Sequence, residues 1–207
     1  MADAIIFYTH PRSRGRIVRW MLEECGANYR TEIVAYGPAM KSPDYLAVNP
    51  MGKVPAIRVG EEVVTETAAI CAFLADFHPD AGLVPPPAGR GAYYRWLFFA
   101  AGPFEQAMIL KALGATIGEE QRGFVGTTDM DRLADILDAA LAEREFIAGD
   151  RFTAADVYLG AQIGFAFQLG SLPERPHLRE YWSRLSARPA YLRAKATDDA
   201  LIAEMAS

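Results

Sequence analysis

The strongest constraint on the fold is a break in the hydrophobic pattern between residues 78 and 91. This stretch, His-Pro-Asp-Ala-Gly-Leu-Val-Pro-Pro-Pro-Ala-Gly-Arg-Gly, contains four prolines and follows neither a helical nor a strand period. Prolines remove backbone donors and stiffen the chain, which is typical of a linker. We therefore predict a domain over residues 1–78, a linker over residues 79–90 and a second domain over residues 91–207.

Before the linker, strand and helix patterns alternate. Four strands are predicted, at residues 4–8, 29–34, 55–59 and 63–65. Apolar residues at helical spacing between Ile17 and Cys25, and again between Ile70 and Phe77, predict two helices, and Ser42 is placed to cap a short third one. Because parallel strands need a helical crossover, this order predicts a mixed four-stranded sheet covered by helices.

Beyond the linker the strand patterns stop, and a bundle of helices is predicted. Five helical segments are expected, at residues 93–113, 133–141, 154–169, 176–187 and 189–196. The first should be kinked at Gly102-Pro103. The third is apolar on nearly every side, which predicts a buried central helix. The fold class is therefore α/β followed by all-α.

Charge and cysteine content exclude several classes of protein. The net charge is −5, unlike the basic balance of a dedicated nucleic-acid-binding protein. The two cysteines, Cys25 and Cys71, lack Cys-x-x-Cys spacing and the three histidines are isolated, so no disulfide framework, dithiol motif or metal is expected. No signal peptide or bilayer-spanning stretch is visible, which favours a cytoplasmic protein without a membrane partner.

Four short motifs follow one another along the chain. They are Asn49-Pro50-Met51-Gly52-Lys53-Val54-Pro55, Glu66-Thr67-x-Ala-Ile, Phe152-Thr153-Ala154-Ala155-Asp156-Val157 and Arg188-Pro189-Ala190. Their order and spacing resemble those of the cytosolic glutathione S-transferase superfamily. The resemblance implies a thioredoxin-like glutathione-binding domain with the mixed four-stranded sheet, followed by a helical bundle domain that shapes a hydrophobic substrate site.

The same resemblance implies an enzyme, a glutathione transferase of cytoplasmic detoxification. It would use glutathione as co-substrate and join its thiolate to a hydrophobic electrophile. Peroxidase, dehalogenase and isomerase activities of the same thiolate are not separated by the sequence, although the Ser-Ser-Cys loop of maleylacetoacetate isomerases is absent. Family members are usually homodimers, so a homodimer is expected. The alternative is a non-catalytic binding or regulatory protein of the same fold.

By resemblance, two segments bind glutathione. Val54 precedes a proline that is cis in the family, and its backbone would pair with the cysteinyl part of the ligand; the alternative is an ordinary edge-strand proline. Lys53, with Lys41 as a weaker candidate, would reach the glycyl carboxylate. Glu66 and Thr67 open a helix and would bind the γ-glutamyl end, the alternative being a plain helix cap.

The loop after the first strand is predicted to activate the thiol. A free thiol has a pKa near 8.5, and a hydroxyl that donates to the sulfur stabilises the thiolate. Ser13-Arg14-Gly15-Arg16 resembles the loop of serine-type members, so Ser13 is the catalytic candidate, followed by Tyr8 and then Thr9. Ser13 is also placed as a helix N-cap, a role that uses its oxygen and leaves its proton for the thiolate.

In the second domain, Thr153 and Asp156 have the spacing of a capping box, flanked by the possible hydrophobic staple of Phe152 and Val157. We interpret this motif as a folding signal, because it lies at the start of the predicted central helix.

Overall fold

The computed structural model describes residues 4–206 and divides into two compact units. One unit combines the chain up to Leu83 with the chain from Arg188 onward, and the other is Val84–Ala187. That residues 79–90 form a linker between two domains remains a prediction. The structure adds that the last helix, which we had assigned to the second domain, groups by its contacts with the first unit.

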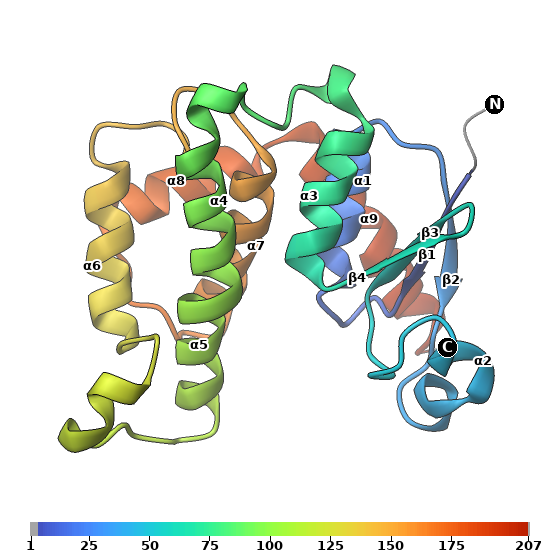
Figure 1. Cartoon of the computed structure of the whole chain (residues 1–207), viewed down its shortest axis with the longest axis horizontal. Helices are drawn as coiled ribbons and strands as arrows, with labels where there is room; N and C mark the ends of the chain where they lie inside the picture. The colour runs from blue at the N-terminus through green and yellow to red at the C-terminus, as the bar shows by residue number, and fades with distance from the viewer. Residues whose placement is uncertain (1–3, 207) are drawn as a thin grey trace. The chain divides into compact units, whose positions relative to one another are not determined.

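A mixed sheet forms the centre of the first unit (Figure 1). Its strands are β1 (Ile5–Thr9), β2 (Tyr29–Ile33), β3 (Ala56–Val59) and β4 (Glu62–Thr65). Their order in the sheet is β2-β1-β3-β4, with β1 parallel to β2 and the other two pairs antiparallel. The predicted four-stranded mixed sheet is confirmed, including the hairpin of β3 and β4.

Helices cover this sheet at the predicted positions. They are α1 (Gly15–Glu24), α2 (Pro43–Leu46) and α3 (Thr67–Phe77). The α1 face formed by Val18, Met21 and Leu22 is completely buried. The Oγ atom of Ser42 accepts a hydrogen bond from the backbone N–H of Tyr45 at 3.3 Å, which confirms the predicted cap of α2.

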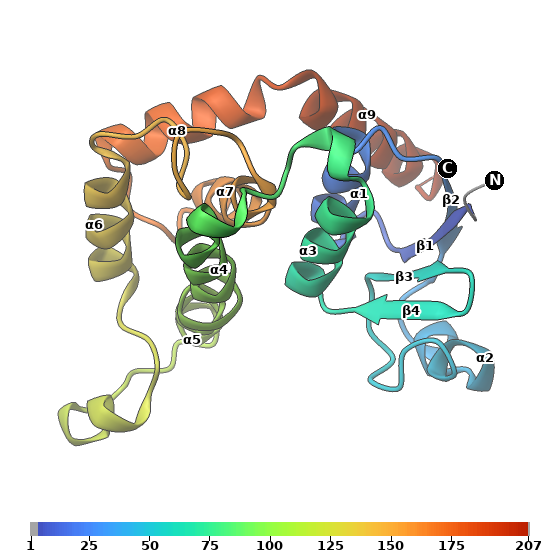
Figure 2. The same cartoon turned by 45° about the horizontal axis from the view of Figure 1, so that its top comes forward.

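The last helix, α9 (Pro189–Glu204), packs against α1 although the two are far apart in sequence (Figure 2). It is longer than predicted. The helix and its N-cap residue are held to α1 by four charge pairs, two of them from its second half, that no local pattern reveals. The pairs are Arg16–Asp199 (2.7 Å), Arg19–Asp198 (2.9 Å), Glu23–Arg193 (2.9 Å) and Glu24–Arg188 (2.7 Å). Bases precede acids along both helices, so an antiparallel alignment matches every pair.

Arg188 tests how much these pairs stabilise the first unit. Its guanidinium makes two hydrogen bonds to the Glu24 carboxylate, at 2.7 and 2.8 Å, and the Glu24 side chain is only 7% exposed. Arg188→Met should lower the free energy of unfolding by about 2 kcal/mol, because a nearly buried carboxylate loses its counter-charge. Arg193→Met, at an exposed pair, should cost less than about 1 kcal/mol. Urea denaturation checks both, and equal losses would contradict this ranking.

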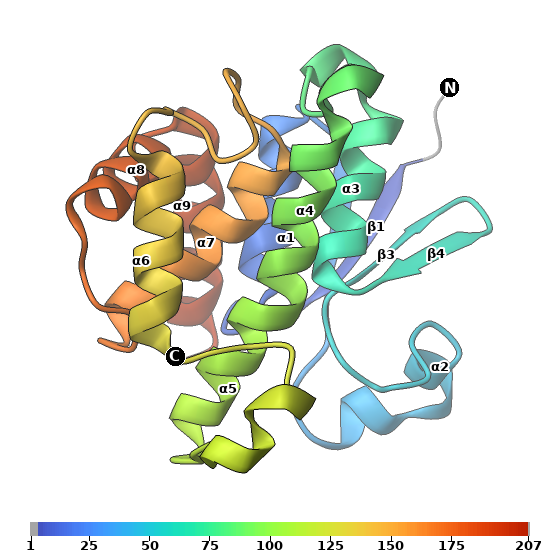
Figure 3. The ribbon, with the colours of Figure 1, turned by 60° about the vertical axis from the view of Figure 1, so that its left-hand side comes forward.

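The second unit is helical, as predicted (Figure 3). Its helices are α4 (Arg90–Phe99), α5 (Glu105–Ala112), α6 (Met130–Leu141), α7 (Ala154–Gln168) and α8 (Pro176–Ser186). A π-helical turn, Ala100–Phe104, joins α4 to α5 at the predicted kink, where Pro103 has no N–H to donate. Within residues 4–206, no helix combines the length and apolar character that crossing a bilayer requires.

The helix α7 is the buried centre of this unit, as its all-round apolar pattern predicted. Two glycines let α8 approach it closely: a Cβ added to Gly160 would lie 2.3 Å from Leu185, and one added to Gly164 would lie 2.3 Å from the Trp182 indole. The helix begins with the predicted capping box of Thr153 and Asp156. The motif therefore serves the packing of this unit.

Candidate functional site

Strand register brings the predicted site segments to one end of the sheet. Tyr8, near the end of β1, pairs with Ala56 at the start of β3, and Ala56 in turn pairs with Thr65 at the end of β4. The loop after β1, the segment before β3 and the start of α3 therefore leave the sheet side by side. These are the segments that contain Ser13, Lys53–Val54 and Glu66–Thr67.

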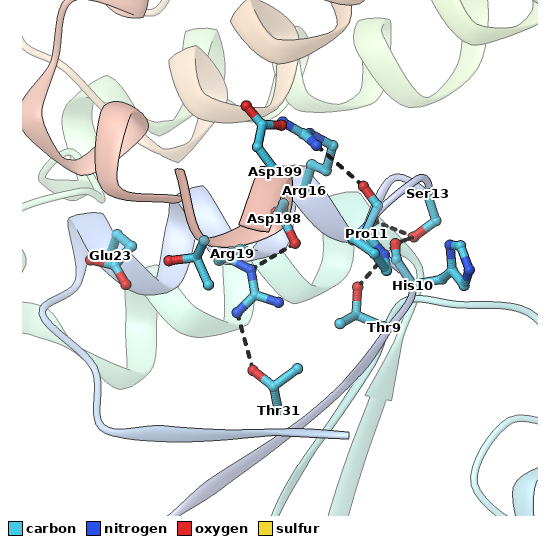
Figure 4. Close-up of polar contacts among 12 residues, drawn as sticks. Thr9, His10, Pro11, Ser13, Arg16, Arg19, Glu23, Thr31, Asp198 and Asp199 are labelled. Carbon is cyan, nitrogen blue, oxygen red and sulfur yellow. Dashed lines mark hydrogen bonds and ion pairs between the residues drawn. The ribbon is translucent and has the colours of Figure 1, made fainter. Parts of the chain in front are cut away.

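Ser13 lies in the turn between β1 and α1, half-buried (Figure 4). Its hydroxyl donates to the carbonyl oxygen of His10 at 2.7 Å, and its oxygen accepts from the backbone N–H of Gly15 at 2.9 Å. The predicted N-cap role is wrong: the N-cap of α1 is Arg14, and no side chain caps this helix. The hydroxyl proton is also engaged with a backbone carbonyl, rather than free as the cap interpretation required.

The His10 carbonyl, and with it the Ser13 hydroxyl, belongs to a tightly held loop. The Nδ1 atom of His10 accepts a hydrogen bond from the backbone N–H of Arg12 at 3.2 Å, and the His10 ring lies 4.0 Å from the Tyr36 ring, centroid to centroid. The Tyr36 hydroxyl donates to the Arg12 carbonyl oxygen at 3.1 Å. Burial, helped by the Arg12 charge, lowers the pKa of His10, so its imidazole is neutral near pH 7.

Arg16 ties the same loop to the last helix. One of its nitrogens donates to the Pro11 carbonyl oxygen at 3.3 Å, and another binds Asp199 at 2.7 Å (Figure 4). Behind it, the buried guanidinium of Arg19 binds Asp198 and Thr31. Arg16 and Arg19 therefore fix the start of α1 in place.

The two other hydroxyl candidates belong to strand β1, where Tyr8 is half-buried and Thr9 is buried. Thr9 is completely buried, and a Cβ on Gly15 would lie 1.9 Å from its Oγ1, so the first turn of α1 covers it. Tyr8 packs on the apolar cluster of Val34, Met40, Tyr45, Val48 and Ala56. Of the three candidates, only Ser13 stands in the turn itself.

The peptide bond between Val54 and Pro55 is cis, as the resemblance implied. The edge-strand alternative is wrong, because Pro55 precedes β3, which is an inner strand. Among the described residues, no backbone hydrogen bond is recorded for Val54. The adjacent Lys53 side chain is exposed.

Glu66 adopts an unusual conformation at the start of α3. It has φ +65°, the one positive φ at a non-glycine residue within residues 4–206. Such residues cost about 1–3 kcal/mol and cluster at functional sites. Glu66 is the N-cap residue of α3 by position, but its side chain makes no capping hydrogen bond, and the buried Thr67 is the first residue of the helix. The first N–H groups of α3 have no partners within the helix and favour an anion.

Neither cysteine takes part in this site. Burial raises the pKa of the Cys25 thiol to about 12 and raises the pKa of the Cys71 thiol still further, so both stay protonated near neutral pH. Within the described part of the chain, no group of three or more His, Cys, Asp or Glu side chains is placed to hold a metal ion.

Three groups of contacts around the site were missed by sequence reasoning. They are the hydrogen bond from the Tyr36 hydroxyl to the loop after β1, the contacts of Arg16 with Pro11 and Asp199, and the side chains that hold the backbone of residues 51–53. The first two join segments that are distant in the sequence. In the third, Lys41, Tyr45 and Asn49 bind backbone carbonyls four to eleven residues further on, and no apolar or capping pattern marks these bonds. The lone signal was Lys41, which we had considered for a different role.

A four-stranded thioredoxin-like unit with a cis-proline before an inner strand, joined to a helical unit, defines the class of protein. Two family models match, described as glutathione S-transferase N-terminal domain, over residues 13–76, and C-terminal domain, over residues 118–189. The chain is 30% identical over 174 residues to glutathione S-transferase 3 of Zea mays, which covers 76% of this chain and 77% of that protein. The chain therefore belongs to the glutathione S-transferase family, a family of enzymes.

Two further comparisons extend this result. Over 199 residues the chain is 30% identical to maleylacetoacetate isomerase of Pseudomonas aeruginosa, covering 90% of this chain and 93% of that protein. The crystal structure of the theta class glutathione S-transferase from Xanthomonas axonopodis pv. citri, with glutathione bound, matches with a TM-score of 0.75 and 29% identity. That match covers 94% of this chain and 97% of the other. The predicted fold class is confirmed.

Proposed function

We propose that this protein is a glutathione transferase that joins the glutathione thiolate to a hydrophobic electrophile. The observation that carries the proposal is the convergence, at one end of the sheet, of a hydroxyl, an open peptide edge and a helix N-terminus. These three features match the thiol, the cysteinyl backbone and the γ-glutamyl carboxylate of one tripeptide. Glutathione bound to a solved relative supports the same ligand.

Each site residue has a distinct role in this proposal. Ser13 donates to the sulfur and keeps it ionised, as in serine-type enzymes of the family. The N–H and C=O of Val54 pair with the cysteinyl backbone, as a strand would. Lys53 attracts the glycyl carboxylate. The start of α3, with the Thr67 hydroxyl and the Glu66 carboxylate, receives the charged γ-glutamyl end.

Catalysis then consists of presenting an ionised thiol close to an electrophile. The thiolate sulfur forms the new bond to the electrophilic carbon, and the leaving group departs with the electron pair of the bond that breaks. Holding the two reactants together replaces a bimolecular encounter in water. Peroxide reduction by the same thiolate is a variant of this proposal.

Isomerase activity is a second candidate, favoured by the match to maleylacetoacetate isomerase over nearly the whole chain. The loop Ser13-Arg14-Gly15 lacks the Ser-Ser-Cys sequence of that class, so we rank conjugation first. A non-catalytic glutathione-binding protein is the remaining alternative.

We further propose that the enzyme is a cytoplasmic homodimer that serves in detoxification. The two free cysteines, Cys25 and Cys71, fit a reducing compartment. On α4, Tyr94 and Phe98 lie one helical turn apart and are both exposed, which suits an interface with a second copy. Sedimentation at micromolar concentration should give the mass of two chains, and a single-chain mass would contradict the dimer.

The experiment that tests the function combines binding with turnover. Calorimetry should show heat on titration with glutathione, and absorbance should show conjugation of an activated aryl halide in the presence of glutathione. Maleylacetoacetate and an organic hydroperoxide, tested in parallel, rank the alternative reactions. Tight glutathione binding without turnover of any of them would favour the non-catalytic alternative, and no affinity at millimolar glutathione would overturn the proposal.

A further inference from the structure

The loop after β1 makes a tight turn from His10 to Ser13 (Figure 4). The backbone N–H of Ser13 donates to the carbonyl oxygen of His10 at 2.9 Å, and the Ser13 hydroxyl donates to the same oxygen at 2.7 Å. Pro11 occupies the second position of this turn, where its fixed φ is favourable. The direction of the Ser13 hydroxyl therefore depends on how firmly residues 10–12 are held.

The His10 side chain closes this turn. Its Nδ1 atom accepts a hydrogen bond from the backbone N–H of Arg12 at 3.2 Å, two residues further on. Asparagine and aspartate side chains make the same kind of bond at the first position of turns. The His10 side chain is buried, and no other partner of the Arg12 N–H is recorded within residues 4–206. The imidazole thus acts here as a turn-forming acceptor.

Tyr36, which follows β2, holds the same turn by two contacts. Its ring packs on the His10 imidazole, with the centroids 4.0 Å apart and the planes 34° apart. Its hydroxyl donates to the carbonyl oxygen of Arg12 at 3.1 Å. Partial burial raises the pKa of Tyr36, so this hydroxyl remains a donor. Arg12 therefore has its N–H held by His10 and its carbonyl held by Tyr36, and the backbone that leads into Ser13 is fixed.

This arrangement requires a neutral imidazole, because a proton on Nδ1 would place a second donor against the Arg12 N–H. Arg12 is the charged group beside the ring, Tyr36 is neutral, and the Arg14 charge acts on Tyr36. Among the described residues, no carboxylate is recorded as a partner of His10. Burial and the Arg12 charge lower the pKa of His10, so the acceptor persists to a pH below the ordinary histidine range.

We propose that His10, packed on Tyr36, is a positioning residue that holds the turn in which the Ser13 hydroxyl reaches the glutathione sulfur, and that it does so only while its imidazole is neutral. This proposal rests on the proposed function, because it concerns the same thiol. It adds a second group that must lose its proton before conjugation is fast. His10 affects the sulfur through the turn and does not itself bind the sulfur.

The pH dependence of conjugation tests the proposal, with kcat/KM for an activated aryl halide measured at saturating glutathione. In the wild type, log kcat/KM should fall by about one per pH unit where only the bound thiol gains a proton, and by about two per pH unit below the pKa of His10. His10→Asn supplies an amide oxygen that can replace Nδ1 and does not titrate, so its slope should stay near one.

His10→Phe keeps a ring on Tyr36 and removes the acceptor. It should raise the pKa of the bound thiol by about one unit, because the turn loses about the free energy of one hydrogen bond. The ultraviolet absorbance of the thiolate measures this pKa directly. An unchanged thiol pKa in His10→Phe would overturn the proposal, and His10→Asn should restore the wild-type value.

His177→Asn is the matched control for loss of a histidine. His177 lies in the second unit, where its Nδ1 atom is 3.0 Å from the Asp138 carboxylate, so this variant should keep the wild-type profile. A single slope near one in the wild type would contradict the proposal. Lower activity of His10→Asn than of the wild type at acid pH would also contradict it, because that result would mean that a charged imidazole helps the thiolate.

Nuclear magnetic resonance without glutathione separates this proposal from the proposed function. The His10 ring signal, assigned with His10→Asn, should titrate below the ordinary histidine range, and the amide signals of Arg12 and Ser13 should change with the same midpoint. In Tyr36→Ala the midpoint should rise, because the ring is less buried. Amide signals that did not follow the His10 titration would refute the positioning role. If the wild type neither bound nor used glutathione, the proposed function would fail while this measurement still reported on the turn.

Discussion

Replacing Ser13 with alanine is expected to reduce kcat/KM for glutathione conjugation about a hundredfold near neutral pH, which corresponds to a rise of about two units in the pKa of the bound thiol, or roughly 2.7 kcal/mol. The reason is that the Ser13 hydroxyl can exchange a neutral carbonyl acceptor for the charged sulfur of the thiolate. In the structure without ligand, the Ser13 hydroxyl donates to the neutral carbonyl of His10 at 2.7 Å. When a thiolate arrives, the same proton can turn to a charged acceptor, and such bonds are roughly twice as strong.

The geometry of the turn allows the Ser13 hydroxyl proton to change its direction. The N–H of Gly15 holds the Ser13 oxygen at 2.9 Å, so the proton can rotate about the Cβ–Oγ bond while the oxygen stays in place. The His10 carbonyl and the sulfur compete for one proton. The expected gain on ionisation is the difference in free energy between the two hydrogen bonds, and this difference would lower the pKa of the thiol.

The pH dependence distinguishes this mechanism from simple loss of binding. In the wild type the bound thiol is expected to ionise at a lower pH, so kcat/KM for the electrophile, measured at saturating glutathione, should reach its plateau about two units earlier than in Ser13→Ala. Above the pKa of the free thiol the two enzymes should converge. Thr9→Val and Tyr8→Phe serve as controls and should keep the wild-type profile. A profile shifted by Tyr8→Phe and unchanged in Ser13→Ala would reassign the catalytic hydroxyl to tyrosine.

Removal of the Asp156 carboxylate should lower the free energy of unfolding by about 3–5 kcal/mol, the range for leaving buried polar partners of a charge unpaired. One oxygen accepts from the backbone N–H of Ile147 and from the Tyr181 hydroxyl, at 2.8 and 2.9 Å. The other accepts from the N–H and the hydroxyl of Thr153, at 2.8 and 2.9 Å. The loss is therefore much larger than the cost of an ordinary helix cap.

Asp129 provides a matched control at the start of α6. Its exposed carboxylate accepts only from the N–H of Arg132, at 2.8 Å, so Asp129→Ala should cost about 1 kcal/mol. Asp156→Asn should be nearly as damaging as Asp156→Ala, because the amide nitrogen would face donors. Denaturation in urea checks the ranking. A loss near 1 kcal/mol in Asp156→Ala would show that the carboxylate acts only as a cap.

The same carboxylate affects stability as the pH changes. Burial raises the pKa of Asp156 above its unfolded value, although all four hydrogen bonds oppose the shift. The folded state thus binds the proton more tightly, and the contribution of this group to stability falls as the pH rises through its folded pKa.

Most of the fold could be predicted because its signals are local. The hairpin of β3 and β4, the cap at Ser42 and the apolar periods of α1 and α7 each depend on residues within a few positions of one another. The second half of α9 could not be predicted in the same way. Its residues 197–204 show no clear apolar face, and their helix is stabilised by Asp198 and Asp199 binding bases on α1.

The candidate site could be predicted only in part, for a related reason. Motifs identified the three segments, and sheet topology explains why they meet. The conformation of Glu66 had no local signal, since a positive φ at a non-glycine residue is unfavourable locally and is imposed by the surrounding structure. The sequence suggested two roles for the Ser13 hydroxyl, as a helix N-cap and as a donor to the thiolate. Neither role predicts its hydrogen bond to the His10 carbonyl inside the same turn.

The packing of α9 on α1 also sets an order of events during synthesis on the ribosome. Residues 14–25 leave the exit tunnel early, yet the partners of Arg16, Arg19 and Glu24 are made more than 160 residues later, at about 5–20 residues per second. Until then the face of α1 that α9 covers stays exposed, while all of Val84–Ala187, which forms a compact unit of its own, has already been synthesised. A nascent chain halted short of Arg188 would therefore lack the acidic partners of Arg16 and Arg19, and the turn that contains Ser13 would lose the support they give.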